Sequence, residues 1–438
     1  MKGMCVMPFV NQGFPLSAAV RMDYLNKLKE GKPISTVKVP GHGTQPVYRI
    51  KLQYLSYNPY NTRFLSHAKT WEKRLGRELD NERPEDVEQI EKFLWEYKKD
   101  KNENTINSLI REGQLQPGVV TLDGLILAGN RRFRLINEID RNPAKYGIHA
   151  NLQEFEAAIL DTTLEKKDIV EYESFYQYGQ EDKVDYDPIQ KYIAAWEQRN
   201  VHKFSFEKIA ANFAALTNGD IKIVKRWLDV YDLMDEYLDY IDEPGIYTAL
   251  TGNEESFLNL LDTIKSLRGR AQNTSWPYTD FDIDDLKLRY YDYIRIGKST
   301  HEFRLFKKIF LNKTRWTKFN ATVKKSVEDA SDGFLSIDEY RSKFKNDNEE
   351  QISVRRKNDF KEKTEKKLDK LFGDERSYIQ SKEEEETPLK TAQQAYQKLE
   401  KLMSLVDNGL DNSVNVDELL EKVKDIQKIV GKIKQTID

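Results

Sequence analysis

The sequence predicts an α+β protein in which a small mixed domain comes first and helices make up the rest. Alternating apolar residues at 47–52 predict a strand, and residues 119–122 and 125–128 predict a hairpin closed by a tight turn at Asp123 and Gly124. Beyond residue 187 the apolar residues follow helical spacing. Because strands gather in the first part and helices in the second, the α+β class is expected.

Length and composition favour a soluble protein of two or three domains. The 438 residues exceed one core of ordinary size, and the net charge of -3 nearly cancels, so any basic surface is local. No run approaches the roughly 20 apolar residues that cross a bilayer, and the first residues lack the charged and apolar segments of an export signal. We expect a cytoplasmic protein with no membrane partner.

Cysteine and histidine usage predicts neither a disulfide nor a metal site. Cys5 is the one cysteine, which excludes an intrachain disulfide and a cysteine-based zinc cluster and fits a reducing compartment. The five histidines are scattered without ligand spacing.

The chain begins with an N-terminal extension, assigned to residues 1–45, that contains a short helix at 17–31. The first domain is assigned to residues 46–184. After its first strand, Asn58 and Pro59 form a break, and helices are expected at 87–99 and 105–112, the second ended by Gly113.

A helix carrying three arginines in its first turns follows the hairpin directly. It starts near Gly129, and Arg131, Arg132 and Arg134 come next. The first-turn N–H groups and the helix dipole favour an anion there, and guanidinium groups add charge-assisted donors suited to phosphate oxygens. The alternative is that these arginines decorate a solvated helix or pair with nearby acids.

Three segments in this order resemble the N-terminal domain of the ParB family. That domain carries an N-P-x-x-x-R box, a helix, a G-x-x-Q-P segment and a G-E-R-R-x-R-A box, and it shares the ParB/sulfiredoxin fold. The chain has Leu55-Ser-Tyr-Asn-Pro-Tyr-Asn-Thr-Arg63, then Ile106-Asn-Ser-Leu-Ile-Arg-Glu-Gly-Gln-Leu-Gln-Pro117, then Gly129-Asn-Arg-Arg-Phe-Arg134. Together these segments lie within residues 47–140.

The resemblance implies a site for CTP, or alternatively ATP. The residues that would contact the triphosphate or line its pocket are Gln116, Pro117, Gly129, Asn130, Arg131, Arg132 and Arg134. Asn130 stands where the family has an acid, which puts any step that needs that carboxylate in doubt. The cysteine needed for sulfiredoxin chemistry is missing from this box.

A second family box, E-N-x-Q-R, binds phosphate and magnesium just before a D-L-x-P segment. Asp185, Tyr186 and Pro188 match the latter part, and an ungapped match places Gln180 and Lys183 at the Asn and Arg positions. Gly179 then replaces the metal-linked glutamate, although Glu181 or Glu173 takes that place after a small shift. Mg²⁺ is therefore an uncertain cofactor, and the alternative is that this acidic stretch only connects two domains.

Residues 185–275 predict a helix-turn-helix domain. A helix at 187–198 is followed by one capped by Ser205, a turn at 216–219 and a basic helix at 220–231. The side chains placed to contact phosphates or base edges of double-stranded DNA are Thr217, Asn218, Lys222, Lys225 and Arg226. The alternative is an ordinary helical hairpin, but the ParB family places its helix-turn-helix here.

Three further regions complete the chain. Residues 276–344 interleave basic and aromatic residues, which fits either a second nucleic-acid surface or an amphipathic core helix. Residues 345–387 are dense in charge and predict a mobile linker or an exposed helix. Residues 388–438 contain helical patterns at 392–406 and 416–437 that indicate a hairpin or short coiled coil.

The resemblance implies a nucleotide-regulated DNA-binding protein, associated with the nucleoid and acting in plasmid or chromosome partition or in mobile-element regulation. A homodimer joined through the C-terminal region and a ParA-like ATPase are the implied protein partners. An enzyme on the same fold, either a DNA nuclease or a nucleotide-dependent kinase or NTPase, is the alternative. A third reading is an adaptor with a vestigial pocket.

Overall fold

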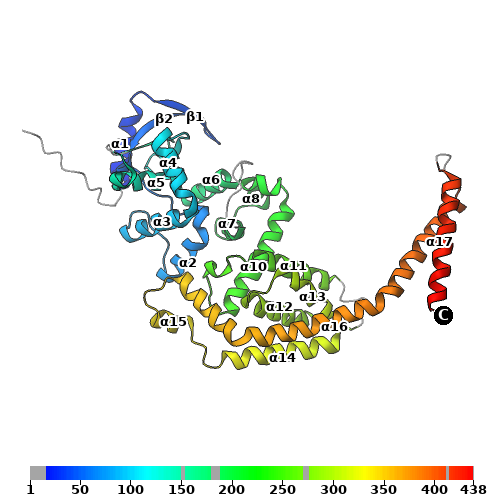
Figure 1. The fold of residues 1–438 in the computed structure, drawn as a ribbon. Helices are drawn as coiled ribbons and strands as arrows, with labels where there is room; N and C mark the ends of the chain where they lie inside the picture. The colour runs from blue at the N-terminus through cyan, green and yellow to red at the C-terminus, as the bar shows by residue number, and fades with distance from the viewer. Residues whose placement is uncertain (1–15, 149–152, 179–187, 270–275, 411–413, 438) are drawn as a thin grey trace, which may run out of the picture. The chain divides into compact units, whose positions relative to one another are not determined.

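The computed structural model describes residues 16–148, 153–178, 188–269, 276–410 and 414–437, which fall into two units (Figure 1). The first unit spans residues 1–368 and the second spans residues 369–438. The first unit combines one mixed five-stranded sheet with many helices, so the expected α+β class is confirmed. Among the described residues, no helix is both long enough and apolar enough to cross a membrane.

The sheet has the strand order β1-β2-β5-β3-β4. The strands are β1 (Ser35–Val39), β2 (Gly43–Lys51), β3 (Gly118–Val120), β4 (Ile126–Ala128) and β5 (Glu154–Ile159). β3 pairs parallel with β5, and the other three pairs are antiparallel. The predicted first strand and the predicted hairpin are confirmed, with Gly124 at φ +80° in the turn.

The sheet begins earlier than the sequence indicated. Residues 35–45, which the sequence placed in the N-terminal extension, form β1 and the start of β2, and Val39 is buried. Their polar alternation hid the strand, because one face of this edge hairpin stays in solvent.

Side chains alternate between two cores on the two faces of the sheet. Val120 and Ile126 point into one cluster with Phe155, whereas Val119 and Leu127 point into the other. The first-domain helices that cover these faces are α1 (Ala18–Lys29), α2 (Leu65–Leu75), α3 (Pro84–Glu96), α4 (Asn102–Glu112), α5 (Asn130–Arg141) and α6 (Lys166–Tyr178). The helices expected at 17–31, 87–99 and 105–112 are thereby confirmed to within a few residues.

The remainder of the first unit is helical. Its helices are α7 (Pro188–Asn200), α8 (Phe206–Asn212), α9 (Ala214–Thr217), α10 (Ile221–Tyr240), α11 (Glu254–Arg268), α12 (Asp280–Arg295), α13 (Thr300–Leu311), α14 (Lys313–Ser331) and α15 (Ile337–Lys343). On α13 and α14 the aromatic residues Phe303, Phe306, Phe310, Trp316 and Phe319 are at most 3% exposed. These aromatic side chains therefore belong to the core, as the amphipathic-helix interpretation expected.

The charge-dense segment at 345–387 is helical throughout its described length from residue 349. It forms the first part of α16 (Glu349–Asp407), and within the first unit Ile352, Phe360 and Leu368 are buried at intervals of eight residues. In the second unit the rest of α16 and α17 (Val416–Ile437) confirm the two predicted C-terminal helices.

Candidate functional site

The helix α5 starts at a position that only glycine suits. Gly129 holds φ +106°, and a Cβ there would lie 2.9 Å from Cζ of Phe155. The carbonyl of Gly129 accepts the first helical hydrogen bond, from the N–H of Phe133 at 2.8 Å. No side chain caps this end and no acid lies in the first turn. The N–H groups of the first turn and the positive end of the dipole therefore remain available to an anion.

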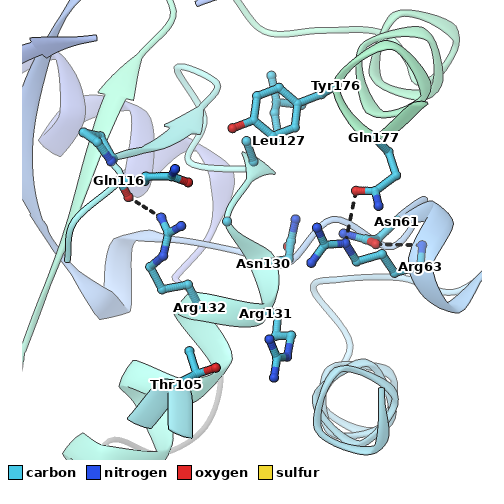
Figure 2. A pocket seen from close by; sticks show the side chains of 13 residues that line it. Asn61, Arg63, Thr105, Gln116, Leu127, Asn130, Arg131, Arg132, Tyr176 and Gln177 are labelled. Atoms are coloured by element: carbon cyan, nitrogen blue, oxygen red, sulfur yellow. Dashed lines mark hydrogen bonds between the residues drawn. The ribbon is translucent and has the colours of Figure 1, made fainter. Parts of the chain in front are cut away.

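A cavity of about 170 Å³ opens beside this helix start (Figure 2). It is lined by Asn61, Arg63, Thr105, Gln116, Pro117, Leu127, Ala128, Gly129, Asn130, Arg131, Arg132, Tyr176 and Gln177. The structure thus brings together six of the residues expected at the site, Gln116, Pro117, Gly129, Asn130, Arg131 and Arg132.

Three guanidinium groups surround the cavity, and no described lining residue is acidic. Arg132 Nη1 donates to the carbonyl of Gln116, and Arg63 Nε donates to Gln177 Oε1 at 3.1 Å (Figure 2). Arg131 Nη2 donates to Asn102 Oδ1 at 2.9 Å. Burial lowers the pKa of both Arg131 and Arg132, and repulsion from Arg63 lowers each pKa further. The buried Nε of Arg131 has no hydrogen-bond partner. The site therefore concentrates positive charge that the lining residues do not neutralise.

Asn130 holds the helix start against the loop that carries Asn58. Its Oδ1 accepts the N–H of Asn58 at 2.9 Å, and its Nδ2 donates to the carbonyl of Ile126 at 2.8 Å. The amide can make both bonds because it has a donor and an acceptor, whereas a carboxylate could only accept. Asn130 therefore has a local structural role.

Glu173 is the carboxylate that lies next to this loop. It is 4% exposed and accepts hydrogen bonds from the N–H of Thr62 at 3.3 Å and from Asn58 Nδ2 at 3.4 Å. It does not line the cavity. No group of three or more potential metal ligands is found among the described residues. Mg²⁺ is usually held by one or two carboxylates together with substrate phosphates. Because no described residue that lines the cavity is a carboxylate, these residues fit a magnesium ion poorly.

One expected contact residue lies elsewhere. Arg134 points away from the cavity: its Nη1 lies 3.2 Å from Glu138 Oε2, its Nε donates to the carbonyl of Glu91, and its guanidinium stacks 5.1 Å from the ring centroid of Trp95. Arg134 follows Arg132 by two positions, over which the helix turns by about 200°. Arg134 therefore lies on a different face of the helix. Its proposed phosphate contact is corrected to a structural ion pair.

Gln180 and Lys183 lie outside the described residues, so their expected roles stay predictions. A second helix, α6, reaches the cavity through Tyr176 and Gln177, which lie near its end. The sequence did not assign these two residues or Thr105 to the site, and it assigned no contact to Asn61 or Arg63, although both lie in the N-P-x-x-x-R segment. For Tyr176 and Gln177 the sequence shows only a tyrosine and a glutamine side by side on a helix before the expected box. Such a pair is too common to identify a binding site.

The segment predicted to form a helix-turn-helix folds as three helices, α8, α9 and α10. Ser205 Oγ accepts the N–H of Lys208 and caps α8, and Asp220 Oδ1 accepts the N–H of Lys222 at 2.8 Å and caps α10. The turn between them includes Asn218 at φ +49° and Gly219 at φ +77°.

Three of the five expected DNA contacts lie on the surface. Asn218, Lys222 and Lys225 are exposed, and Lys225 Nζ lies 5.0 Å from the ring centroid of Phe206. Arg226 forms a double ion pair with Asp262 on α11, at 2.6 and 2.9 Å. Thr217 is 0% exposed and its hydroxyl donates to the carbonyl of Ala210, so its expected contact with DNA is corrected to a structural role in the turn.

No protein-family model matches this chain, and a search of the curated proteins finds no match.

Proposed function

We propose that the chain binds a nucleoside triphosphate, CTP in the first instance, at the start of α5 and that it is a ParB-like, nucleotide-regulated DNA-binding protein. One observation carries the proposal: an uncapped helix start is surrounded by the guanidinium groups of Arg63, Arg131 and Arg132, and no described acid lines the cavity between them.

Charge makes this arrangement unfavourable without a ligand. A cation near a helix N-terminus costs roughly 0.3–1 kcal/mol, and like charges raise the free energy further when they are partly buried. A triphosphate reverses each contribution, because its oxygens accept from the first-turn N–H groups and pair with the guanidinium groups. The polyanion thus explains why Arg131 and Arg132 converge on the most positive end of their own helix.

Double-stranded DNA is the second proposed ligand, held by the N-terminal part of α10. Lys222 and Lys225 are exposed there and suit backbone phosphates, and Asn218 suits a base edge or a phosphate. Arg226 would have to leave Asp262 to take part. The ParB resemblance adds the setting, which is partition or mobile-element regulation at the nucleoid together with a ParA-like ATPase.

An enzyme on the same fold is the second candidate, and Glu173 is the observation that favours it. This buried carboxylate lies beside the N-P-x-x-x-R segment, where a kinase, NTPase or nuclease would need an acid. Its hydrogen bonds to Asn58 and Thr62 already occupy it, which favours binding over catalysis.

The test combines ligand binding with a search for product. Equilibrium dialysis of the full chain against radiolabelled CTP, ATP, GTP and UTP is followed by DNA-binding titrations with and without the bound nucleotide, in the presence of Mg²⁺. Saturable CTP binding that alters DNA affinity, with intact DNA and intact nucleotide, supports the proposal. Nuclease or phosphoryl-transfer products that disappear in Glu173→Gln favour the enzyme, and no binding of any triphosphate contradicts both.

A further inference from the structure

A hollow of about 300 Å³, called the α6 hollow below, lies against a face of α6 that differs from the one reaching the cavity at α5. Three segments that are distant in the sequence form it: the turn between β1 and β2, α6 with the residues just before it, and α8. On α6 the lining residues are Asp168, Glu171, Tyr172 and Phe175. Their spacing of three and four positions places them on one side of the helix.

Apolar and aromatic side chains form most of the wall of this hollow. Tyr172 is buried, and its ring centroid lies 6.3 Å from that of His42 in the hairpin turn. Leu164 is half-buried, whereas the large side chain of Phe175 is 37% exposed. An apolar body placed in the hollow removes the exposed ring of Phe175 from water, which is favourable.

The charged side chains that line the hollow are acidic. Asp168 and Glu171 are among them, and no lysine or arginine is found among the described residues of the lining. Lys208 Nζ pairs with Glu171 Oε2 at 2.7 Å. Asp168 forms no ion pair or side-chain hydrogen bond within the part of the chain that the structure describes. The hollow therefore offers a carboxylate to a cation, next to two aromatic rings.

The size of the hollow fits a small molecule better than a protein partner. Stable protein interfaces bury roughly 800 Å² on each side, whereas Phe175 alone among the exposed large apolar side chains of the described residues lines the hollow. Pockets for small molecules begin at roughly 300 Å³, and a cavity of roughly 150 Å³ already holds a benzene ring. A compound with one ring and a short charged chain therefore fits here.

We propose that the α6 hollow binds a small organic cation, in which an ammonium or guanidinium group is attached to an aromatic or aliphatic body. The body packs against Phe175 and Tyr172, and the cationic group pairs with Asp168. Both contacts select positive charge, because a carboxylate accepts charge-assisted hydrogen bonds and the face of an aromatic ring attracts a cation.

The α6 hollow is separate from the cavity at α5, since the two share no lining residue. They are nevertheless close: Tyr172 of the hollow stacks on Tyr176 of the cavity, with 6.0 Å between the ring centroids. A cation against Tyr172 therefore lies one aromatic ring away from the proposed nucleotide. The inference does not rest on nucleotide binding, and its test needs no triphosphate.

Binding of three probes that share one body tests the charge preference in the full chain. The probes are 2-phenylethylammonium, 2-phenylethanol and 3-phenylpropanoate, which are cationic, neutral and anionic at neutral pH. Saturation-transfer NMR titrations measure their affinities at fixed salt. The cation is expected to bind saturably, the neutral alcohol at least about fivefold more weakly, and the anion more weakly still.

Variants then locate the bound probe. Asp168→Asn keeps the size of the side chain and removes its charge, so it should weaken the cation by roughly 10-fold and change the affinity of the alcohol by less than about twofold. Phe175→Ala removes the apolar contact and should weaken both probes. The matched control Glu165→Gln removes a negative charge just before α6 and outside the hollow, and it should leave both affinities within about twofold.

Asp168 also lies in the first turn of α6, where an acid stabilises the helix. Thermal unfolding of each variant therefore accompanies the titrations, and the comparison of probes on the wild type holds even if one variant is unstable. No saturable binding of 2-phenylethylammonium, equal affinities for the cation and the alcohol, or equal effects of Asp168→Asn and Glu165→Gln would each overturn the inference.

Discussion

Replacing Arg132 with alanine should weaken nucleotide binding while leaving the fold in place. The guanidinium of Arg132 lies in a cavity whose described lining includes no acid, and it donates a hydrogen bond to the carbonyl of Gln116. One charge-assisted hydrogen bond to a phosphate contributes about 1.5–3 kcal/mol. The dissociation constant for CTP should therefore rise by roughly 10- to 150-fold, measured by isothermal titration calorimetry at fixed salt.

Arg134 supplies the matched control on the same helix. It pairs with Glu138 outside the cavity and stacks on Trp95, so Arg134→Ala should lower the free energy of unfolding by about 1–2 kcal/mol and change CTP affinity by less than about threefold. Thermal unfolding of both variants without ligand separates the two effects. Equal losses of affinity in the two variants, or no loss in Arg132→Ala, would refute the assignment of the cavity.

Three further predictions follow from single side chains. Gly129→Ala forces an L-residue to φ +106° and should cost roughly 1–3 kcal/mol of unfolding free energy in chemical denaturation; an unchanged midpoint contradicts the geometry. Lys222→Ala should weaken DNA binding for all sequences and reduce the salt slope by about 1, whereas Thr217→Ala, at a buried position, should lower stability and leave that slope unchanged. Burial raises the pKa of Asp292 to about 6. A carboxyl whose pKa is raised on folding stabilises the protein fully below its ordinary pKa of 3.8, and this stabilisation is lost as pH rises through 6. Asp292→Asn keeps an acceptor for Tyr240 and cannot ionise, so it should flatten the loss of stability in urea titrations across pH 4–7.

The sequence identified the main elements of the site because they are local. The hairpin turn, Gly129 and the arginines lie within one short stretch of sequence. A strand that leads directly into a helix determines the path of the backbone there. The sequence did not show which arginines face the cavity, because two residues on one helix can point to opposite sides. Arg132 and Arg134 differ in this way, and the partners that attract Arg134, Glu138 and the carbonyl of Glu91, come partly from a distant segment.

Other features depended on tertiary packing. Tyr176 and Gln177 reach the cavity from a helix more than 40 residues beyond α5's first turn, and no periodicity links such segments. Thr217 resembled an exposed turn residue, yet its hydroxyl satisfies a buried carbonyl. On α16 the dense charge concealed the widely spaced buried residues Ile352 and Phe360, since most of each turn remains in solvent.

The most direct test of the triphosphate site is a crystal structure of the full chain grown with CTP and Mg²⁺. We expect phosphate oxygens within hydrogen-bond distance of the first-turn N–H groups of α5 and of the guanidinium groups of Arg131 and Arg132. A cavity that stays empty at saturating CTP, or a nucleotide bound elsewhere on the chain, would contradict it.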